Sequence, residues 1–210
     1  GHPGEDKFIN NVGAEATMDL TLHGKIGNIP ASEVVVVVEK KAPHRIRIRG
    51  RVNEVSFYGP NLSIWTEIST EPGSNEFRIS DELTNHGTFD EEFQIIYHAN
   101  FGRPLLGRGA RMLTASTKIV PFNENAAKAI DKQELYPGPT KGFTEEVYKI
   151  YPKADNAGNA TAVLVNPKGD RGVTLSWPVK QLPYLTQWKN TAAETTGYVP
   201  GIEPGTGFPH

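Results

Sequence analysis

The chain has 210 residues, of which 37% are hydrophobic and 22% charged, and its formal net charge is −2. This composition is typical of a globular protein, and the small negative charge gives no electrostatic case for binding nucleic acid or an anionic membrane. No apolar run approaches the roughly 18 residues that a membrane-spanning helix needs. The lack of cysteine excludes disulfides and thiolate chemistry. It fits a cytoplasmic protein, and it is also common in periplasmic and secreted bacterial proteins.

The first half of the chain predicts short strands after a polar start. The first twenty residues predict a loop, and a glycine-rich segment follows. Five successive valines, Val34–Val38, predict a buried strand. The next strand alternates arginine with aliphatic residues, which predicts one solvated face. The strands predicted up to residue 80 are Glu33–Lys40, His44–Val52, Glu54–Phe57, Asn61–Ser69 and Glu76–Ser80.

The second half continues this pattern after a polar connection at Asp81–Asp90. Glu124–Lys132 predicts one short helix, and Leu182–Lys189 carries Tyr184 and Trp188. Many short strands separated by turns predict an all-β sandwich or barrel. The further strands predicted are the front half of Ile95–Leu106, Ser116–Phe122, Glu145–Tyr151, Thr161–Asn166, Gly172–Pro178 and Gly197–Ile202.

The two ends of the chain predict a fragment of a longer protein. The sequence begins with Gly1–Gly4 and stops at Gly207–His210, directly after a turn rich in glycine and proline. We therefore expect residues 1–210 to form a single β-sandwich domain that is truncated at both ends.

Three polar residues are candidates for chemistry, namely His23, His98 and Glu203. Each lies beside glycine or proline at the end of an apolar segment, where a side chain can face a cleft. A histidine acid and a carboxylate base can move protons on and off a sugar hydroxyl. Two histidines and one carboxylate can also bind a metal ion, and all three residues can be purely structural. Residue types alone leave these alternatives open.

Five motifs follow one another along the chain: Leu22–Ile26 with Asn28–Ala31, Asp81–Asn85, Tyr97–Gly102, Pro104–Leu106 and Gly197–Thr206. In this order they resemble the motifs of the aldose 1-epimerase (galactose mutarotase-like) superfamily. The resemblance is strongest to a branch described as a domain of unknown function, which has a His-x-Asn-Phe-Gly motif. It extends from His23 to Thr206 and implies a galactose mutarotase-like β-supersandwich without a cofactor.

The resemblance also implies roles for individual residues. His98 corresponds to the general acid that protonates the ring oxygen, and Glu203 to the general base that takes the proton from the anomeric hydroxyl. His23 corresponds to a second histidine near the ring oxygen. The candidates for sugar binding are Asn100, Arg103 and Trp188. The expected partner is a small-molecule sugar, with no metal, and the sequence does not indicate an oligomeric state.

The sequence departs from the superfamily pattern at several positions. Asn100 replaces a tyrosine, and no arginine that could bind the sugar precedes His23. Glu145 and Glu146 lie near the place of an aspartate that binds sugar hydroxyls, and His86 is expected to be a turn residue. Two alternatives to an isomerase therefore stay open. These are a non-catalytic carbohydrate-binding module and a glycan lyase or hydrolase that uses the same cleft.

Overall fold

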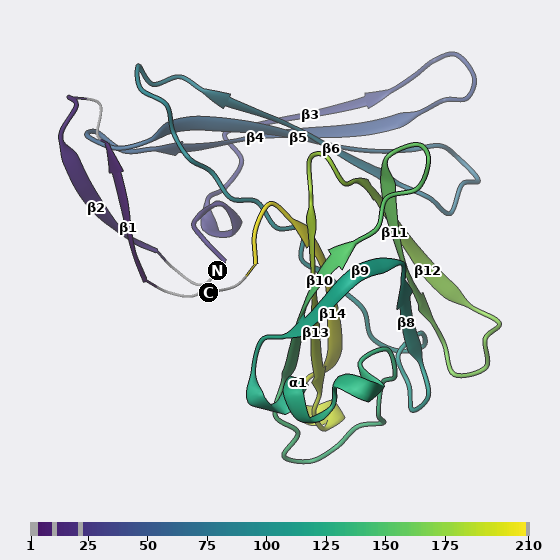
Figure 1. The fold of residues 1–210 in the computed structure, drawn as a ribbon. Helices are drawn as coiled ribbons and strands as arrows, with labels where there is room; N and C mark the ends of the chain where they lie inside the picture. Colours follow the sequence, from purple (N-terminus) through teal and green to yellow (C-terminus); the bar gives the residue numbers. More distant parts are fainter. Residues whose placement is uncertain (1–3, 10–11, 21–22, 209–210) are drawn as a thin grey trace. The chain divides into compact units, whose positions relative to one another are not determined.

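The computed structural model describes residues 4–9, 12–20 and 23–208. The chain consists of two compact units, Gly1–Phe93 and Gln94–His210, and each is built almost entirely from antiparallel strands (Figure 1). The all-β fold class predicted from the sequence is confirmed. That residues 1–210 form a single truncated domain stays a prediction, and Gly1–Pro3, Pro209 and His210 lie outside the described residues.

The first unit contains a hairpin and a four-stranded sheet. The hairpin falls where the sequence predicted a loop, so that prediction is wrong: its strands pair from Gly4 with Leu20 to Ile9 with Glu15. Gly13, at φ 79°, provides the left-handed backbone conformation that such a turn favours. The elements of this unit are β1 (Gly4–Ile9), β2 (Glu15–Leu20), the 3₁₀ turn Ile26–Asn28, β3 (Glu33–Val38), β4 (Ile46–Val55), β5 (Asn61–Thr70) and β6 (Arg78–Asn85).

The valine strand β3 is exposed, which contradicts the predicted burial. The register aligns Val36, Ile48, Ile68 and Ile79 in one row across the four-stranded sheet. Their exposed fractions are 63%, 46%, 43% and 43%, so the row forms an exposed apolar face. The five valines indicated burial because the sequence does not show that β3 lies at a sheet edge.

The opposite face of this sheet carries the arginines, as the alternation predicted. Arg47 and Arg49 form ion pairs with Glu67 of the neighbouring strand, at 3.7 and 3.6 Å. The predicted polar connection at Asp81–Asp90 is wrong in its first half, because β6 continues to Asn85. His86 follows the strand, and its Nε2 lies 2.7 Å from the Ser63 hydroxyl.

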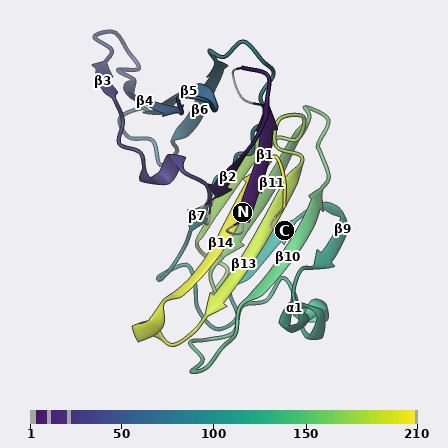
Figure 2. The same ribbon diagram turned by 90° about the vertical axis from the view of Figure 1, so that its left-hand side faces the viewer.

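The second unit is a sandwich of two sheets (Figure 2). One sheet has the strand order β7-β14-β13-β10-β9, and the other has the order β12-β11-β8. Buried residues of both sheets, including Ile150, Leu185 and Ile202 from the first and Met112 and Leu164 from the second, form one core. The strands are β7 (Ala99–Asn100), β8 (Arg111–Thr114), β9 (Ser116–Pro121), β10 (Glu146–Pro152), β11 (Asn159–Val165), β12 (Gly172–Pro178), β13 (Tyr184–Thr191) and β14 (Tyr198–Gly205).

The predicted helix is shorter than expected. Helix α1 spans Glu124–Lys128, and a separate 3₁₀ turn follows at Ile130–Lys132. Asn123 begins the helix because its side chain accepts a hydrogen bond from the Ala126 amide. Strand β8 (Arg111–Thr114) was not predicted, because the sequence indicated a loop up to Arg111 and no element for the three residues that follow.

Strand β7 contains only two residues, although the sequence predicted a longer strand there. Its partner β14 contains Pro200 and Pro204, whose carbonyls accept hydrogen bonds from the amides of Phe101 and Tyr97. In an antiparallel pair, the N–H and the C=O of one residue point to the same neighbouring strand. The carbonyls of these two prolines point to the β7 side, where proline has no N–H to donate in return. The prolines therefore weaken pairing on the β7 side, while pairing with β13 continues along all of β14.

A polar cluster lies beneath the five-stranded sheet, on its core face. Lys189 is 1% exposed, and its ammonium lies 3.2 Å from a carboxylate oxygen of Glu146. The same ammonium donates to the carbonyls of Lys132 and Leu135, at 3.0 and 3.1 Å. The hydroxyl of Tyr148 also donates to Glu146, at 2.9 Å. These bonds attach the segment after α1 to the underside of the sheet.

Candidate functional site

His98 and Glu203 meet on the outer face of the five-stranded sheet. Ile202 pairs with Ala99 in the register of β14 and β7, which places the preceding His98 opposite Glu203. Nε2 of His98 lies 3.1 Å from Oε1 of Glu203. The Glu203 side chain is 5% exposed and the His98 side chain 25% exposed. The pair therefore combines a buried carboxylate with an imidazole that solvent or a ligand can reach.

Gly201 makes room for the Glu203 carboxylate. Residues 201 and 203 lie on the same face of β14, and the carboxylate folds back over the glycine. A Cβ atom on Gly201 would lie 2.1 Å from Oε1 of Glu203 and 3.3 Å from the Trp188 ring. Gly201 was not among the predicted site residues. A glycine two positions before a strand carboxylate is the signal that could have identified it.

We expect Gly201→Ala to displace the Glu203 carboxylate and lower activity without unfolding the protein. The new methyl group can be accommodated only if the carboxylate moves away from its position beside His98. A displacement of about 1 Å costs on the order of 100-fold in rate. The measurement is kcat/KM for the reaction proposed in the next subsection, and circular dichroism checks that the variant is folded. The matched control is Gly27→Ala, because a Cβ atom there meets nothing within 4 Å; equal activity of the two variants would contradict the prediction.

Trp188, Asn100 and Glu145 surround the pair. Gly201 pairs with Asn100 on one side and with Trp188 on the other, so both side chains share the face that carries Glu203. The Trp188 ring makes an edge-to-face contact with His98, with ring centroids 5.8 Å apart. Its indole N–H donates to Glu145 Oε2 at 2.7 Å. Trp188 thus connects the carboxylate of Glu145, a candidate from the sequence, to the pair of His98 and Glu203.

Burial changes the proton affinity of both members of the pair. It raises the pKa of Glu203 to about 7, and the nearby Glu145 carboxylate adds to this increase. Burial lowers the pKa of His98, while hydrogen bonding to the backbone and to Asn100 opposes the change. The pKa of Glu203 therefore lies near neutrality and the pKa of His98 lies below its ordinary value, which suits a proton-transferring pair.

The other predicted residues lie in different surroundings. His23 belongs to the first unit, at φ 63°, and its proximity to the pair stays a prediction. Arg103 donates to Glu194, and its guanidinium lies 5.9 Å from the ring centre of Tyr198. Its role in sugar binding stays a prediction. Glu146 belongs to the core-face cluster around Lys189.

Metal binding was an open alternative for His23, His98 and Glu203. Within residues 4–9, 12–20 and 23–208, no three His, Asp or Glu side chains are grouped closely enough to hold a metal ion. The described part of the chain also contains no helix long and apolar enough to cross a membrane.

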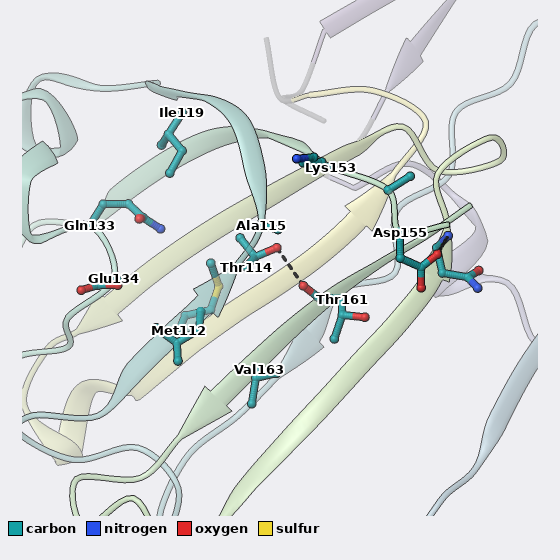
Figure 3. A pocket seen from close by; sticks show the side chains of 13 residues that line it. Met112, Thr114, Ala115, Ile119, Gln133, Glu134, Lys153, Asp155, Thr161 and Val163 are labelled. Carbon is teal, nitrogen blue, oxygen red and sulfur yellow. Dashed lines mark hydrogen bonds between the residues drawn. The ribbon is translucent and has the colours of Figure 1, made fainter. Parts of the chain in front are cut away.

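A separate hollow of about 690 Å³ lies in the second unit (Figure 3). Met112, Ile119 and Val163 line it, together with Thr114, whose hydroxyl donates to the carbonyl of Thr161 at 2.9 Å. None of its lining residues is a candidate from the sequence. Its one aspartate, Asp155, accepts hydrogen bonds from two backbone amides of its own turn. The pair of His98 and Glu203 therefore lies outside this hollow.

Comparison with known proteins identifies relatives of the chain. The family model described as "Domain of unknown function (DUF4432)" matches residues 1–210. A crystal structure from Klebsiella pneumoniae subsp. pneumoniae MGH 78578, of a protein provisionally assigned as an aldose 1-epimerase, is 48% identical, with a TM-score of 0.89. That match covers 90% of this chain and 50% of the other, so the chain spans half the length of that relative.

A second crystal structure shows likeness of fold alone. The Slr1438 protein from Synechocystis sp. PCC 6803 is 16% identical, with a TM-score of 0.62 over 97% of this chain and 63% of the other. No curated protein sequence matches the chain. The resemblance to the aldose 1-epimerase group found in the sequence is confirmed by the first structure.

Proposed function

Because this chain belongs to the DUF4432 family and shares the fold of a protein assigned provisionally as an aldose 1-epimerase, we propose that it interconverts the anomers of a sugar. The observation that carries this proposal is the 3.1 Å approach of His98 Nε2 to Glu203 Oε1. A shared fold does not by itself establish a shared reaction, so the argument depends on this pair.

The proposed reaction needs one proton added and one removed. Protonated His98 donates its proton to the ring oxygen as the bond between that oxygen and C1 breaks. Glu203, as a carboxylate, accepts the proton of the hydroxyl on C1, which becomes a carbonyl. Rotation about the bond between C1 and C2 and closure on the other carbonyl face give the other anomer. The reverse proton transfers restore both residues.

The pair can supply this combination of acid and base near neutrality. With a Glu203 pKa of about 7 and a lowered pKa on His98, the two groups together hold one proton in the mildly acidic range. Transfer of that proton from Glu203 to His98 across 3.1 Å yields the carboxylate base and the imidazolium acid together. When two titrating groups interact, the observed pKa values belong to the pair and not to either residue alone.

The surroundings of the pair are suited to a pyranose. The Trp188 ring offers an apolar face for stacking, and Glu145, bonded to its indole N–H, keeps acceptor capacity for sugar hydroxyls. Asn100, opposite Gly201, offers both a donor and an acceptor at the other side of the pair. Binding groups therefore lie on both sides of the reacting atoms.

The test is anomer exchange measured by NMR on the full-length protein with freshly dissolved α-anomers of several aldoses. We expect exchange faster than the buffer rate, saturating with sugar concentration. Saturable binding with no acceleration for any sugar would instead support a non-catalytic carbohydrate-binding module. Release of a new product from a glycan would support the lyase or hydrolase alternative.

A further inference from the structure

Lys149 lies on the same face of the sheet as the acid–base pair. Glu203 pairs with Thr186, and Thr186 pairs in turn with Lys149 on β10. Residues directly opposite one another in a sheet point to the same face, and neighbouring strands lie about 4.8 Å apart. The Cα atoms of Lys149 and Glu203 are therefore about 10 Å apart across two strand spacings, a separation that a pyranose with a charged substituent can bridge with the side chains.

The Lys149 ammonium is held among aromatic rings. It lies 4.8 Å from the ring centre of Phe122 and 5.8 Å from that of Phe208. The Phe208 ring packs in turn on Tyr184, with ring centroids 4.6 Å apart. These contacts hold the ammonium in place without neutralising it.

Lys149 lacks a counter-ion in the described part of the chain, where no carboxylate lies within 4.0 Å of its ammonium. Lys189, on the other face of the same sheet, differs in this respect, because it has both Glu146 and two carbonyl acceptors. The half-buried charge of Lys149 is therefore available to an anionic ligand group.

Thr186 provides a second, independent observation between the two charged groups. It is 2% exposed, and its hydroxyl makes no hydrogen bond to any described residue. Buried hydroxyls nearly always have a partner, so an open one on the face of a site indicates a position for a ligand atom. The register places this hydroxyl between Glu203 and Lys149.

Building on the proposed function, we propose that the sugar is a hexuronic acid, with its carboxylate bound by Lys149 and a ring hydroxyl bound by Thr186. C1 then lies at the pair of His98 and Glu203, at the opposite end of the ring. One uncompensated positive charge matches a monoanionic carboxylate, whereas a phosphate ester carries close to two negative charges. Aromatic walls, which hydrate a charge poorly, also favour the less strongly hydrated anion.

The test compares three probes on the full-length protein: glucuronate, glucose and glucose 6-phosphate. In Lys149→Met, the ratio of kcat/KM for glucuronate to kcat/KM for glucose falls about 10- to 100-fold, which is the effect of losing one charge-assisted hydrogen bond. The matched control is Lys118→Met. Lys118 is an exposed lysine whose ammonium lies 5.7 Å from the ring centre of Tyr151, and its loss leaves the ratio unchanged.

The outcomes separate this inference from the proposed function. Exchange of glucose with an unchanged ratio in Lys149→Met upholds the function and overturns the hexuronate inference. A preference of the unmodified protein for glucose 6-phosphate, or an equal effect of Lys118→Met, also overturns it. Glucuronate binding without exchange, detected by saturation-transfer NMR and weakened in Lys149→Met, upholds the inference while the isomerase function fails.

Discussion

Replacing Glu203 with glutamine lowers kcat/KM for anomer exchange by about 10²- to 10⁴-fold, the usual contribution of one positioned general base. Glutamine has nearly the same shape and cannot accept the proton of the anomeric hydroxyl. His98→Asn removes the acid and has an effect of the same order. Because the two residues are proposed to act as one unit, the double variant loses about as much activity as either single variant, and not the product of the two single losses. NMR exchange rates measure all three.

The pH dependence provides a separate check on the pair. Below the lowered pKa of His98 both groups are protonated, so no base is present. Above the Glu203 pKa of about 7 both are deprotonated, so no acid is present. The rate of the unmodified protein therefore has a maximum on the mildly acidic side of pH 7, and it falls as the pH rises through that value. Activity that rises steadily from pH 6 to pH 9 would contradict the shared-proton mechanism.

A matched carboxylate serves as the control for these variants. Glu134 is an exposed residue whose carboxylate accepts a hydrogen bond from Arg111 at 2.8 Å. Glu134→Gln makes the same chemical change away from the pair and leaves the exchange rate within twofold of the unmodified protein. A comparable loss in both variants would show that the effect of Glu203→Gln is not specific to catalysis.

Lys189→Met destabilises the protein by about 3–5 kcal/mol, the usual result of removing one partner from a buried ion pair. The change leaves the Glu146 carboxylate and two backbone carbonyls without their ammonium donor. Burial already lowers the pKa of Lys189, and Glu146 opposes the decrease, so the charge depends on this partner. Urea unfolding measures the free energy of unfolding.

The double variant Lys189→Met with Glu146→Gln recovers part of the loss, because no buried carboxylate is then left without a cation. Lys128→Met is the surface control: its ammonium lies 3.9 Å from Glu124 in an exposed helical pair. Such pairs contribute about 0.3–0.5 kcal/mol. If Lys189→Met cost no more than Lys128→Met, the cluster would not hold the segment after α1 to the sheet.

Strand patterns predicted the all-β class. Their positions beside glycine or proline made His23, His98 and Glu203 candidates, and resemblance to a known superfamily implied the roles of His98 and Glu203. The structure brings these two residues together although about one hundred residues separate them. Pattern alone could not do this, because a register between distant strands is not visible in either segment. The length of β7 was overestimated for a related reason, since the prolines that limit its pairing lie in β14.

Strand β13 shows why the surroundings of the site were harder to predict. Polar residues such as Lys189 and Gln187 usually lie on the solvent side of a strand, and aromatic residues on the core side. The structure has the reverse, since Lys189 and Gln187 are buried on the core face and Trp188 contacts His98. Lys189 can be buried only because Glu146 and the carbonyls of residues 132 and 135 satisfy it, and these partners lie on other segments.

The exposed position of β3 has a consequence for self-assembly. The strand pairs with β4 along one edge, and no described strand pairs with its other edge. An open edge of this kind presents a row of free backbone donors and acceptors to a strand from another molecule. The run of five valines, Val34–Val38, has high β-propensity and includes no proline and no charged residue. Segments that stack into cross-β fibrils have this composition. Covering this edge is therefore a requirement for keeping separate copies of the chain from joining strand to strand.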